Sequence, residues 1–426
     1  MKQLFLLFCA FFMAYAQEVN FTPHGDLSLF TANYDKTYNE LGELVKQTDR
    51  VRYYDSAVGG DVGIASSYLD TSLYVGLYFS QRLKKRNSDT LKNEATLYDE
   101  DLNSLHYIGE AYIQQKYNNH KFSIGRQTKQ SQLLDANHRI TKNSFEGLRY
   151  KYQEDKLDID IFYFDKVASS TISNSVPFNH RYGFLGYGMG YNVGKFTDIS
   201  KHILNEDLST NGAIHADIKY KAEYYDIELE NLYVDNFFNT TSLNTTLKTE
   251  NVFFKLGTIY QTSVGKDYVE KKFSKELKSN LYQGELKYQK NDFVALYRAS
   301  ITPANTDAVY NGTLFSPFSN KAAWIKGFNT AHAFIADTVA QQVLVYNTFR
   351  PNALPPTTVA LSYIRYDIGD KNGDVNYPLD TREKFVQIKG YFSKNLSAKL
   401  IYSLVDNADL LTSKTKNTRF ICEYVF

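Results

Sequence analysis

The side chains that could do chemistry in this chain are cations and carboxylates that recur at every second position of short segments. Arg149 and Lys151 share one face of a segment, and Asp158 and Asp160 share one face of the next. Arginine binds carboxylates through a planar, permanently charged fork. Charges spaced in this way could guide small charged solutes along a wet surface. In a strand, residues at every second position share one face, and we assign the polar face of each segment to the inside. This assignment adds the following inner-face charges: Lys219, Lys221, Lys255, Lys287, Lys389, Lys399, Asp217, Glu223, Glu228, Glu230 and Glu285.

Sequence motifs for other chemistries are missing. The 8 His form no His-Glu-x-x-His pattern and no Cys/His cluster, so we predict no metal site. A phosphate-binding loop near Gly190 would need Gly in place of Met189 and Ser or Thr in place of Phe196. No Gly-x-Ser-x-Gly elbow occurs. We therefore predict no cofactor and no enzymatic activity.

Composition points to strands and to export. The 48 basic and 47 acidic residues nearly cancel, which argues against a nucleic-acid partner. The 35 Tyr and 29 Phe against 3 Met favour β-structure. Residues 1–16 read as a signal peptide, with Lys2, a short apolar run and Ala14-Tyr15-Ala16 before the cleavage point. The remaining residues, 17–426, are predicted to form a single domain without an internal disulfide, because only Cys422 is left.

Segments of about ten residues that alternate in polarity predict the architecture. No stretch after the signal peptide approaches the length of a membrane-spanning helix, and the apolar faces are rich in Tyr and Phe. We therefore predict an all-β fold, a transmembrane antiparallel β-barrel. Bacterial single-chain barrels have even strand numbers. The predicted strands are 24–34, 53–65, 71–80, 107–117, 120–127, 145–153, 156–165, 212–222, 223–234, 250–261, 280–289, 291–301, 338–349, 357–368, 384–393, 396–405 and 417–426.

Seventeen segments and an even strand number are compatible with 16 or 18 strands. We predict 18, with one further strand inside 180–196. A barrel of this size encloses water rather than a packed core. Phe420, Tyr424 and the terminal Phe426 share one face of the last segment. This pattern is typical of the closing strand of bacterial outer-membrane barrels, so we predict that these three residues are the signal for the barrel-assembly machinery.

One region resembles a known family. Gly125-Arg126-Gln127 is followed by Asp135-Ala136-Asn137-His138-Arg139 and then by Phe145-Glu146-Gly147. This order resembles the OprD family of outer-membrane porins over residues 120–150. The resemblance implies an 18-stranded monomer or homotrimer whose loop folds inward to constrict the channel.

The resemblance also implies site residues. Basic residues of the wall would guide carboxylate-bearing solutes, and by motif position we predict Arg126, Arg139 and Arg149, together with Lys151. Asp135 and Asn137 would face them from the folded loop. Strict alternation, however, puts Arg126 with Phe122 and Ile124 on the lipid face. We predict that Gly125 is a bulge that resets the parity; the alternative is that Arg126 lies at the rim.

The sequence thus predicts an outer-membrane porin for passive diffusion of small hydrophilic solutes, with anionic or zwitterionic carboxylate compounds preferred. Its expected partners are these solutes, outer-membrane lipid and lipopolysaccharide, which Lys84-Lys85-Arg86 could contact. Two alternatives stay open. One is a barrel enzyme such as a phospholipase or protease. The other is a surface adhesin that uses the long loops 81–106, 166–211 and 302–337.

Overall fold

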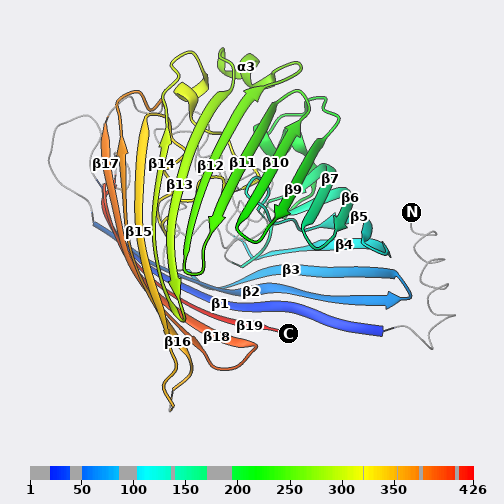
Figure 1. Ribbon diagram of the computed structural model, residues 1–426, viewed down its shortest axis with the longest axis horizontal. Coiled ribbons are helices and arrows are strands. Elements are labelled where there is room, and N and C mark those ends of the chain that lie inside the picture. The colour runs from blue at the N-terminus through cyan, green and yellow to red at the C-terminus, as the bar shows by residue number, and fades with distance from the viewer. Residues whose placement is uncertain are drawn as a thin grey trace.

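The computed structural model describes most of the chain (Figure 1). The described residues are 20–38, 50–85, 103–135, 140–169, 194–319, 321–352, 354–373, 378–407 and 412–426. The predicted signal peptide lies outside these residues. No helix among the described residues has both the length and the hydropathy needed to cross a membrane.

One antiparallel sheet contains the strands. The first half comprises β1 (Asn20–Tyr38), β2 (Arg50–Tyr68), β3 (Thr71–Lys85), β4 (Leu105–Tyr117), β5 (His120–Gln127), β6 (Ser144–Gln153), β7 (Leu157–Ala168), β8 (Thr197–Asp198) and β9 (Ala213–Lys221). The second half comprises β10 (Tyr225–Val234), β11 (Phe238–Lys248), β12 (Val252–Ser263), β13 (Lys278–Lys290), β14 (Phe293–Thr302), β15 (Thr338–Phe349), β16 (Thr357–Ile368), β17 (Leu379–Tyr391), β18 (Leu396–Asp406) and β19 (Thr412–Val425).

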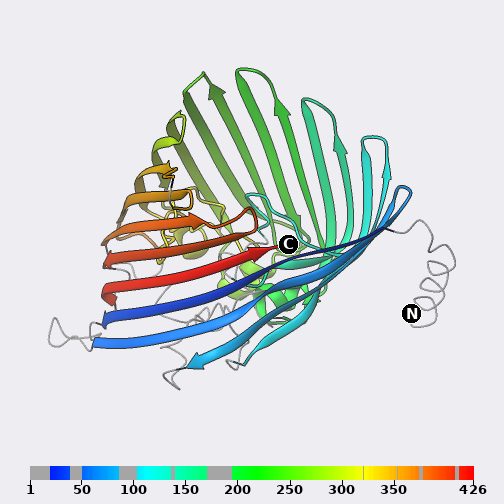
Figure 2. The ribbon, with the colours of Figure 1, turned by 90° about the horizontal axis from the view of Figure 1, so that it is seen from below.

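The sheet closes on itself. β1 pairs with β2 on one side and with β19 on the other, so the wall has no free edge (Figure 2). β8 is a two-residue strand beside the end of β7, and β7 pairs directly with β9. Without β8, 18 of the 19 described strands form the barrel wall. The predicted antiparallel barrel and its 18 strands are confirmed.

The strand that the sequence analysis misplaced is β11. All seventeen predicted segments correspond to strands, and Phe238–Lys248 is the eighteenth wall strand. The placement inside 180–196 was therefore wrong, although residues 180–193 lie outside the described residues. β11 escaped detection because its outward face mixes Thr241 and Thr245 with Leu243, so its hydropathy barely alternates.

Alternation separates an apolar outer face from a polar inner face. In β9, Ile214 and Ile218 point outward and are 48% and 38% exposed, while His215 and Asp217 are buried on the inside. Every wall strand carries exposed apolar side chains, so the outer face of the barrel needs an apolar surrounding.

The two ends of the barrel differ in their connections. One end has tight turns, among them Asn118-Asn119 and Asn291-Asp292, where Asn118 and Asn291 adopt the left-handed conformation. The other end carries the long loops. Among the described residues, three short helical segments lie in these loops: α2 (Ile199–Leu204), α3 (Tyr268–Phe273) and η3 (Val309–Gly312).

In the part of the chain that the structure describes, two long loops turn into the barrel. Loop 128–143 connects β5 to β6, and loop 303–337 connects β14 to β15. Phe318 of the second loop packs against the inward rings of Phe145 and Phe164, with centroids 6.3 and 5.6 Å apart. The largest apolar cluster therefore lies inside the barrel, between these loops and the wall.

Candidate pore-lining site

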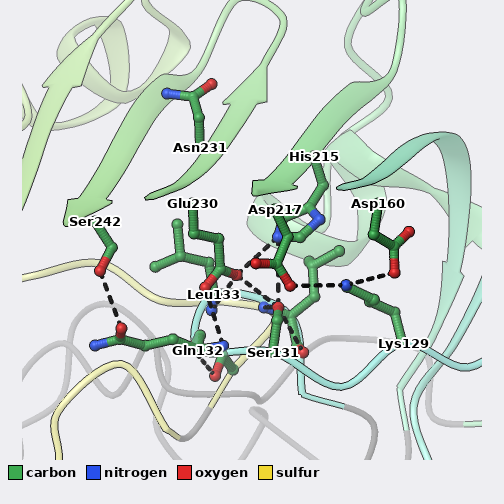
Figure 3. Close-up of polar contacts among 12 residues, drawn as sticks. Lys129, Ser131, Gln132, Leu133, Asp160, His215, Asp217, Glu230, Asn231 and Ser242 are labelled. Carbon is green, nitrogen blue, oxygen red and sulfur yellow. Dashed lines mark hydrogen bonds and ion pairs between the residues drawn. The ribbon is translucent and has the colours of Figure 1, made fainter. Parts of the chain in front are cut away.

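The start of loop 128–143 is fixed to the wall by a buried cation (Figure 3). Nζ of Lys129 lies 2.7 Å from Oδ2 of Asp160 on β7 and 3.1 Å from Oδ2 of Asp217 on β9. All three residues are buried, where ion pairs are poorly screened by solvent. Lys129, which the sequence analysis did not single out, is thus a structural anchor at the entrance of the loop.

The next turn of the same loop is held by Glu230 of β10. The Glu230 carboxylate, which is fully buried, accepts hydrogen bonds from the backbone N–H groups of Gln132 at 3.1 Å and Leu133 at 2.8 Å. The hydroxyl of Ser131 donates to it at 2.5 Å, and Nε2 of His215 lies 2.7 Å away (Figure 3). We predicted Glu230 as a lumen charge; its position is on the inner face, but its function is to hold the loop.

The far end of loop 128–143 reaches the other side of the barrel. Nζ of Lys142 contacts Asp26 of β1 at 3.0 Å and Asp61 of β2 at 2.5 Å. Ile140 belongs to an apolar cluster that includes Ile421 of β19. In the wall, β19 is nine strands from β10 in either direction, so the described parts of this loop attach to opposite walls. The predicted inward-folded loop is confirmed.

Loop 128–143 is also interlocked with loop 303–337. The N–H of Asp135 donates to the carbonyl of Phe318 at 2.9 Å, and its carboxylate binds Nζ of Lys321 at 2.9 Å. Nε2 of Gln132 donates to the carbonyl of Ala322 at 2.6 Å. Asp135 is buried and joins the two loops, with Lys321 as its ion-pair partner, whereas we predicted that it faces the basic residues of the wall. The predicted site residues Asn137 and Arg139 lie outside the described residues.

Beside the anchored loop, the barrel contains a cavity of about 220 Å³. Its lining holds five cations, three carboxylates and three amides: Lys121, Lys129, Arg149, Lys151, Lys219, Asp158, Asp160, Asp217, Asn119, Gln130 and Gln153. The strands β5, β6, β7 and β9 supply all of these residues except three from the turn and the loop. The predicted site residues Arg149 and Lys151 therefore meet in one place.

The charges of this cavity are not equally engaged. Arg149 holds Asp160 through two hydrogen bonds of 2.8 and 2.6 Å. Lys151 is only loosely paired, with Nζ 3.8 Å from Asp160. Among the described residues, Lys121 and Asp158 form no ion pair. Lys121 and Lys151 are thus the least engaged cations of this lining, whereas Arg149 braces the wall.

Arg126 lies on the outer face of the barrel. The register of β5 with β4 and with β6 is continuous through Gly125, so the predicted bulge is not formed. Arg126 keeps the parity of Phe122 and Ile124, and it lies one residue before the loop end of β5. Its Nε is 2.8 Å from the carboxylate of Glu146, its direct cross-strand partner. This geometry matches the alternative that we considered for Arg126, a position at the rim of the barrel.

The remaining motif residues pack the β5–β6 strand pair. A side chain at Gly125 would overlap the carbonyl of Ala111, and Gly125 has a φ of 121° that favours glycine. A side chain at Gly147 would overlap the carbonyl of Tyr163. Gln127 and Phe145 are buried on the inner face. These residues therefore serve close packing next to the in-folded loop.

Sequence reasoning missed residues on the opposite wall. Arg419 lies on the inner face of β19, where it donates to the carbonyl of Phe328 at 2.9 Å. Its parity opposite to Phe420 was the available signal. Lys389 and Lys399, which parity placed on the inner face, are direct cross-strand partners in the structure. Nζ of Lys389 is 3.8 Å from Glu423. The described residues contain no group of three or more His, Cys, Asp or Glu that could hold a metal ion.

Comparison with solved structures places this fold among porins. OpdK of Pseudomonas aeruginosa, in a structure with vanillate, superposes with a TM-score of 0.68 at 16% identity, covering 95% of this chain and 98% of that one. A BenF-like porin from Pseudomonas fluorescens Pf-5 gives 0.72 at 11% identity, with coverage of 95% and 98%. OccAB3 of Acinetobacter baumannii gives 0.71 at 14% identity, with coverage of 95% and 99%. These are OprD-family porins, so the fold implied by the sequence resemblance is confirmed.

No protein-family model matches the chain, and no curated protein matches it.

Proposed function

We propose that this chain is an outer-membrane porin that lets small hydrophilic solutes diffuse passively and favours anionic or zwitterionic carboxylate compounds. The observation that carries the proposal is the cation-rich cavity beside the in-folded loop of an 18-stranded barrel. Barrels of this size enclose an aqueous channel, and fixed charges on the lining then set its selectivity.

The chemistry of the cavity supports both solute types. Lys121 and Lys151 offer cations with little competition from carboxylates, so they suit a solute carboxylate. Asp158 lies in the same lining and could receive the ammonium group of a zwitterion. OpdK, which shares the fold, was crystallised with vanillate, an aromatic carboxylate.

The same proposal covers location and partners. The chain would be exported with its signal peptide removed, and the barrel-assembly machinery would recognise Phe420, Tyr424 and Phe426. The apolar outer face of the barrel would contact outer-membrane lipid, and lipopolysaccharide would lie against the rim that carries the long loops. A monomer or a homotrimer fits this scheme. Neither the enzyme nor the adhesin alternative is favoured by a specific observation among the described residues.

Planar-bilayer recording tests the proposal. The purified, heat-modifiable protein should give steady single-channel currents, and a salt gradient should give a reversal potential that indicates anion preference. Small carboxylates and amino acids should reduce the current as they occupy the channel, whereas uncharged sugars of equal size should do so less. Protein that migrates as folded barrel yet conducts no ions would contradict the porin proposal, and a cation preference would contradict the proposed solutes.

A further inference from the structure

Glu383 is a buried carboxylate on the inner face of β17 that binds loop 303–337. Its oxygens accept hydrogen bonds from three consecutive backbone N–H groups, those of Phe328 at 2.9 Å, Asn329 at 3.2 Å and Thr330 at 3.1 Å. The hydroxyls of Thr330 and Ser403 donate at 2.6 and 2.7 Å. All of these donors are neutral, and the Glu383 side chain has no exposed surface. The loop therefore wraps one anion with its main chain.

Gly327 shows how closely the loop approaches this carboxylate. A Cβ atom at Gly327 would overlap Oε2 of Glu383. The N–H of Gly327 donates to the carbonyl of Thr330 at 2.8 Å, which closes the turn. Consecutive N–H groups that converge on one point form an anion-binding nest. In this structure the nest is filled by the protein's own side chain.

Neighbouring contacts fix the same turn to three strands. The ring of Phe328 packs edge-on against Phe385 of β17 with centroids 4.6 Å apart. Nδ2 of Asn329 donates to Ser403 of β18 at 2.8 Å. Nη2 of Arg419 on β19 donates to the carbonyl of Phe328 at 2.9 Å. Glu383 is the central acceptor of this cluster, because it alone binds three successive backbone groups.

The turn 327–330 lies only a few residues from the interlock between the two in-folded loops. Lys321 and Ala322 of the same loop bind Asp135 and Gln132 of loop 128–143. We infer that Glu383 is a positioning residue for the channel: its carboxylate holds loop 303–337, and through it loop 128–143, in the arrangement that sets the width of the pore. Loss of this carboxylate lets the loops fluctuate, which widens the channel and makes its current unsteady. This inference rests on the proposed porin function.

Three variants break the contact, two at Glu383 and one on the loop side, and a fourth variant controls for charge. Glu383→Gln removes one acceptor oxygen with little change of shape, and Glu383→Ala empties the nest. Gly327→Ala keeps Glu383 but blocks the approach of the loop. Glu423→Gln removes another inner-face carboxylate, one whose ion pair is to Lys389 of the wall. Heat-modifiable migration selects folded protein for each variant.

Hydrogen–deuterium exchange provides a readout that does not depend on transport. Exchange of the amides of residues 328–330 should accelerate at least roughly tenfold in Glu383→Ala and Gly327→Ala, because the loss of hydrogen bonds to a charged group lowers the cost of local opening. Glu423→Gln should exchange as wild type. Unchanged exchange in both Glu383→Ala and Gly327→Ala would overturn the inference.

Bilayer currents and chemical rescue complete the test. Glu383→Ala should show larger and noisier single-channel currents than wild type, and sodium formate should restore steady currents by filling the empty nest. Gly327→Ala should be noisy but insensitive to formate. If the currents of Glu383→Ala are as small and as steady as those of wild type, Glu383 does not position the loops. A wild-type protein that does not conduct would refute the porin function instead, while accelerated exchange would still support the loop contact.

Discussion

Nζ of Lys129 lies 2.7 Å from Oδ2 of Asp160, and this pair joins the first residues of loop 128–143 to β7. The same Nζ also contacts Asp217 on β9, so one cation bridges two neighbouring strands. The loop enters the barrel at this point, and its path across the lumen therefore begins at a buried ion pair.

Lys129→Met is expected to destabilise the barrel. The substitution removes two charge-assisted hydrogen bonds, but Arg149 and Lys219 still neutralise Asp160 and Asp217. We therefore expect the free energy of unfolding to fall by about 2 kcal/mol, less than for a fully isolated buried charge. Urea titration in lipid vesicles, followed by the fluorescence of the 1 Trp in the chain, measures the change.

Lys221→Met is the matched control, because Lys221 is an exposed cation of the same β9. Its unfolding free energy should stay within about 0.5 kcal/mol of wild type. The double variant Lys129→Met/Asp217→Asn should lose less stability than the sum of the two single variants. Additive losses would mean that Lys129 and Asp217 do not interact.

Alternation predicted the wall because each strand separates lipid-facing from lumen-facing side chains. It failed at β11, where Thr241 and Thr245 place polar groups on the outer face. It also gave Arg126 the outward position that the structure has; the bulge that we predicted at Gly125 was an unnecessary correction. The charge of Arg126 is neutralised by Glu146, its register partner, which local parity alone could not reveal.

The loop paths could not be predicted from the sequence. Lys129 binds Asp217, which is 88 residues away, and Gln132 binds Ala322, which is 190 residues away. Such long-range contacts depend on which strands the closed barrel brings near the loops. The hydropathy pattern of a single segment does not predict them. For the same reason Asp135, expected to face the basic residues of the wall, joins two loops instead.

Neutralising the two least engaged lysines of the cavity should shift the ion preference of the channel. Lys121→Gln/Lys151→Gln removes two positive charges from the cavity while Arg149 keeps its bracing contact with Asp160. We expect the reversal potential to move toward cation preference and carboxylate block of the current to weaken roughly tenfold, as for the loss of a charged contact. Bilayer recordings in a salt gradient measure both effects.

Arg126→Gln serves as the control for that experiment, because it removes a positive charge from the outer rim. Its reversal potential should equal that of wild type. If Arg126→Gln shifts ion preference as much as the double lysine variant, the assignment of selectivity to the cavity is wrong.

Gly125 should tolerate no side chain. Its φ of 121° lies outside the range that other residues favour, and a Cβ atom would overlap the carbonyl of Ala111. Gly125→Ala is therefore expected to cost about 2 kcal/mol of unfolding free energy or more. Gly284→Ala is the matched comparison, since the nearest atom to its Cβ would be 3.9 Å away. Equal stabilities of the two variants in urea titration would contradict the steric argument.

Because of His202, we expect the free energy of unfolding to fall in acid. Its ring lies in α2, stacked on Phe318 with centroids 5.2 Å apart, and Nε2 lies 3.2 Å from the carbonyl of Pro317. Burial lowers the pKa of His202 from 6.5 to about 4, although the contact with Pro317 partly opposes this effect. Above pH 6.5 the ring is neutral in both folded and unfolded chains, so its packing contributes fully.

As the pH falls below 6.5, His202 becomes protonated in the unfolded chain but stays neutral in the folded chain, where its ring is buried. The free energy of unfolding should therefore fall by about 1.4 kcal/mol per pH unit, and by about 3 kcal/mol in all, before the loss levels off where the folded ring itself titrates. His202→Phe keeps a stacked ring without a titrating group. The stability of wild type relative to this variant should fall by that amount between pH 7 and pH 4. A difference independent of pH would show that His202 is not buried against Phe318.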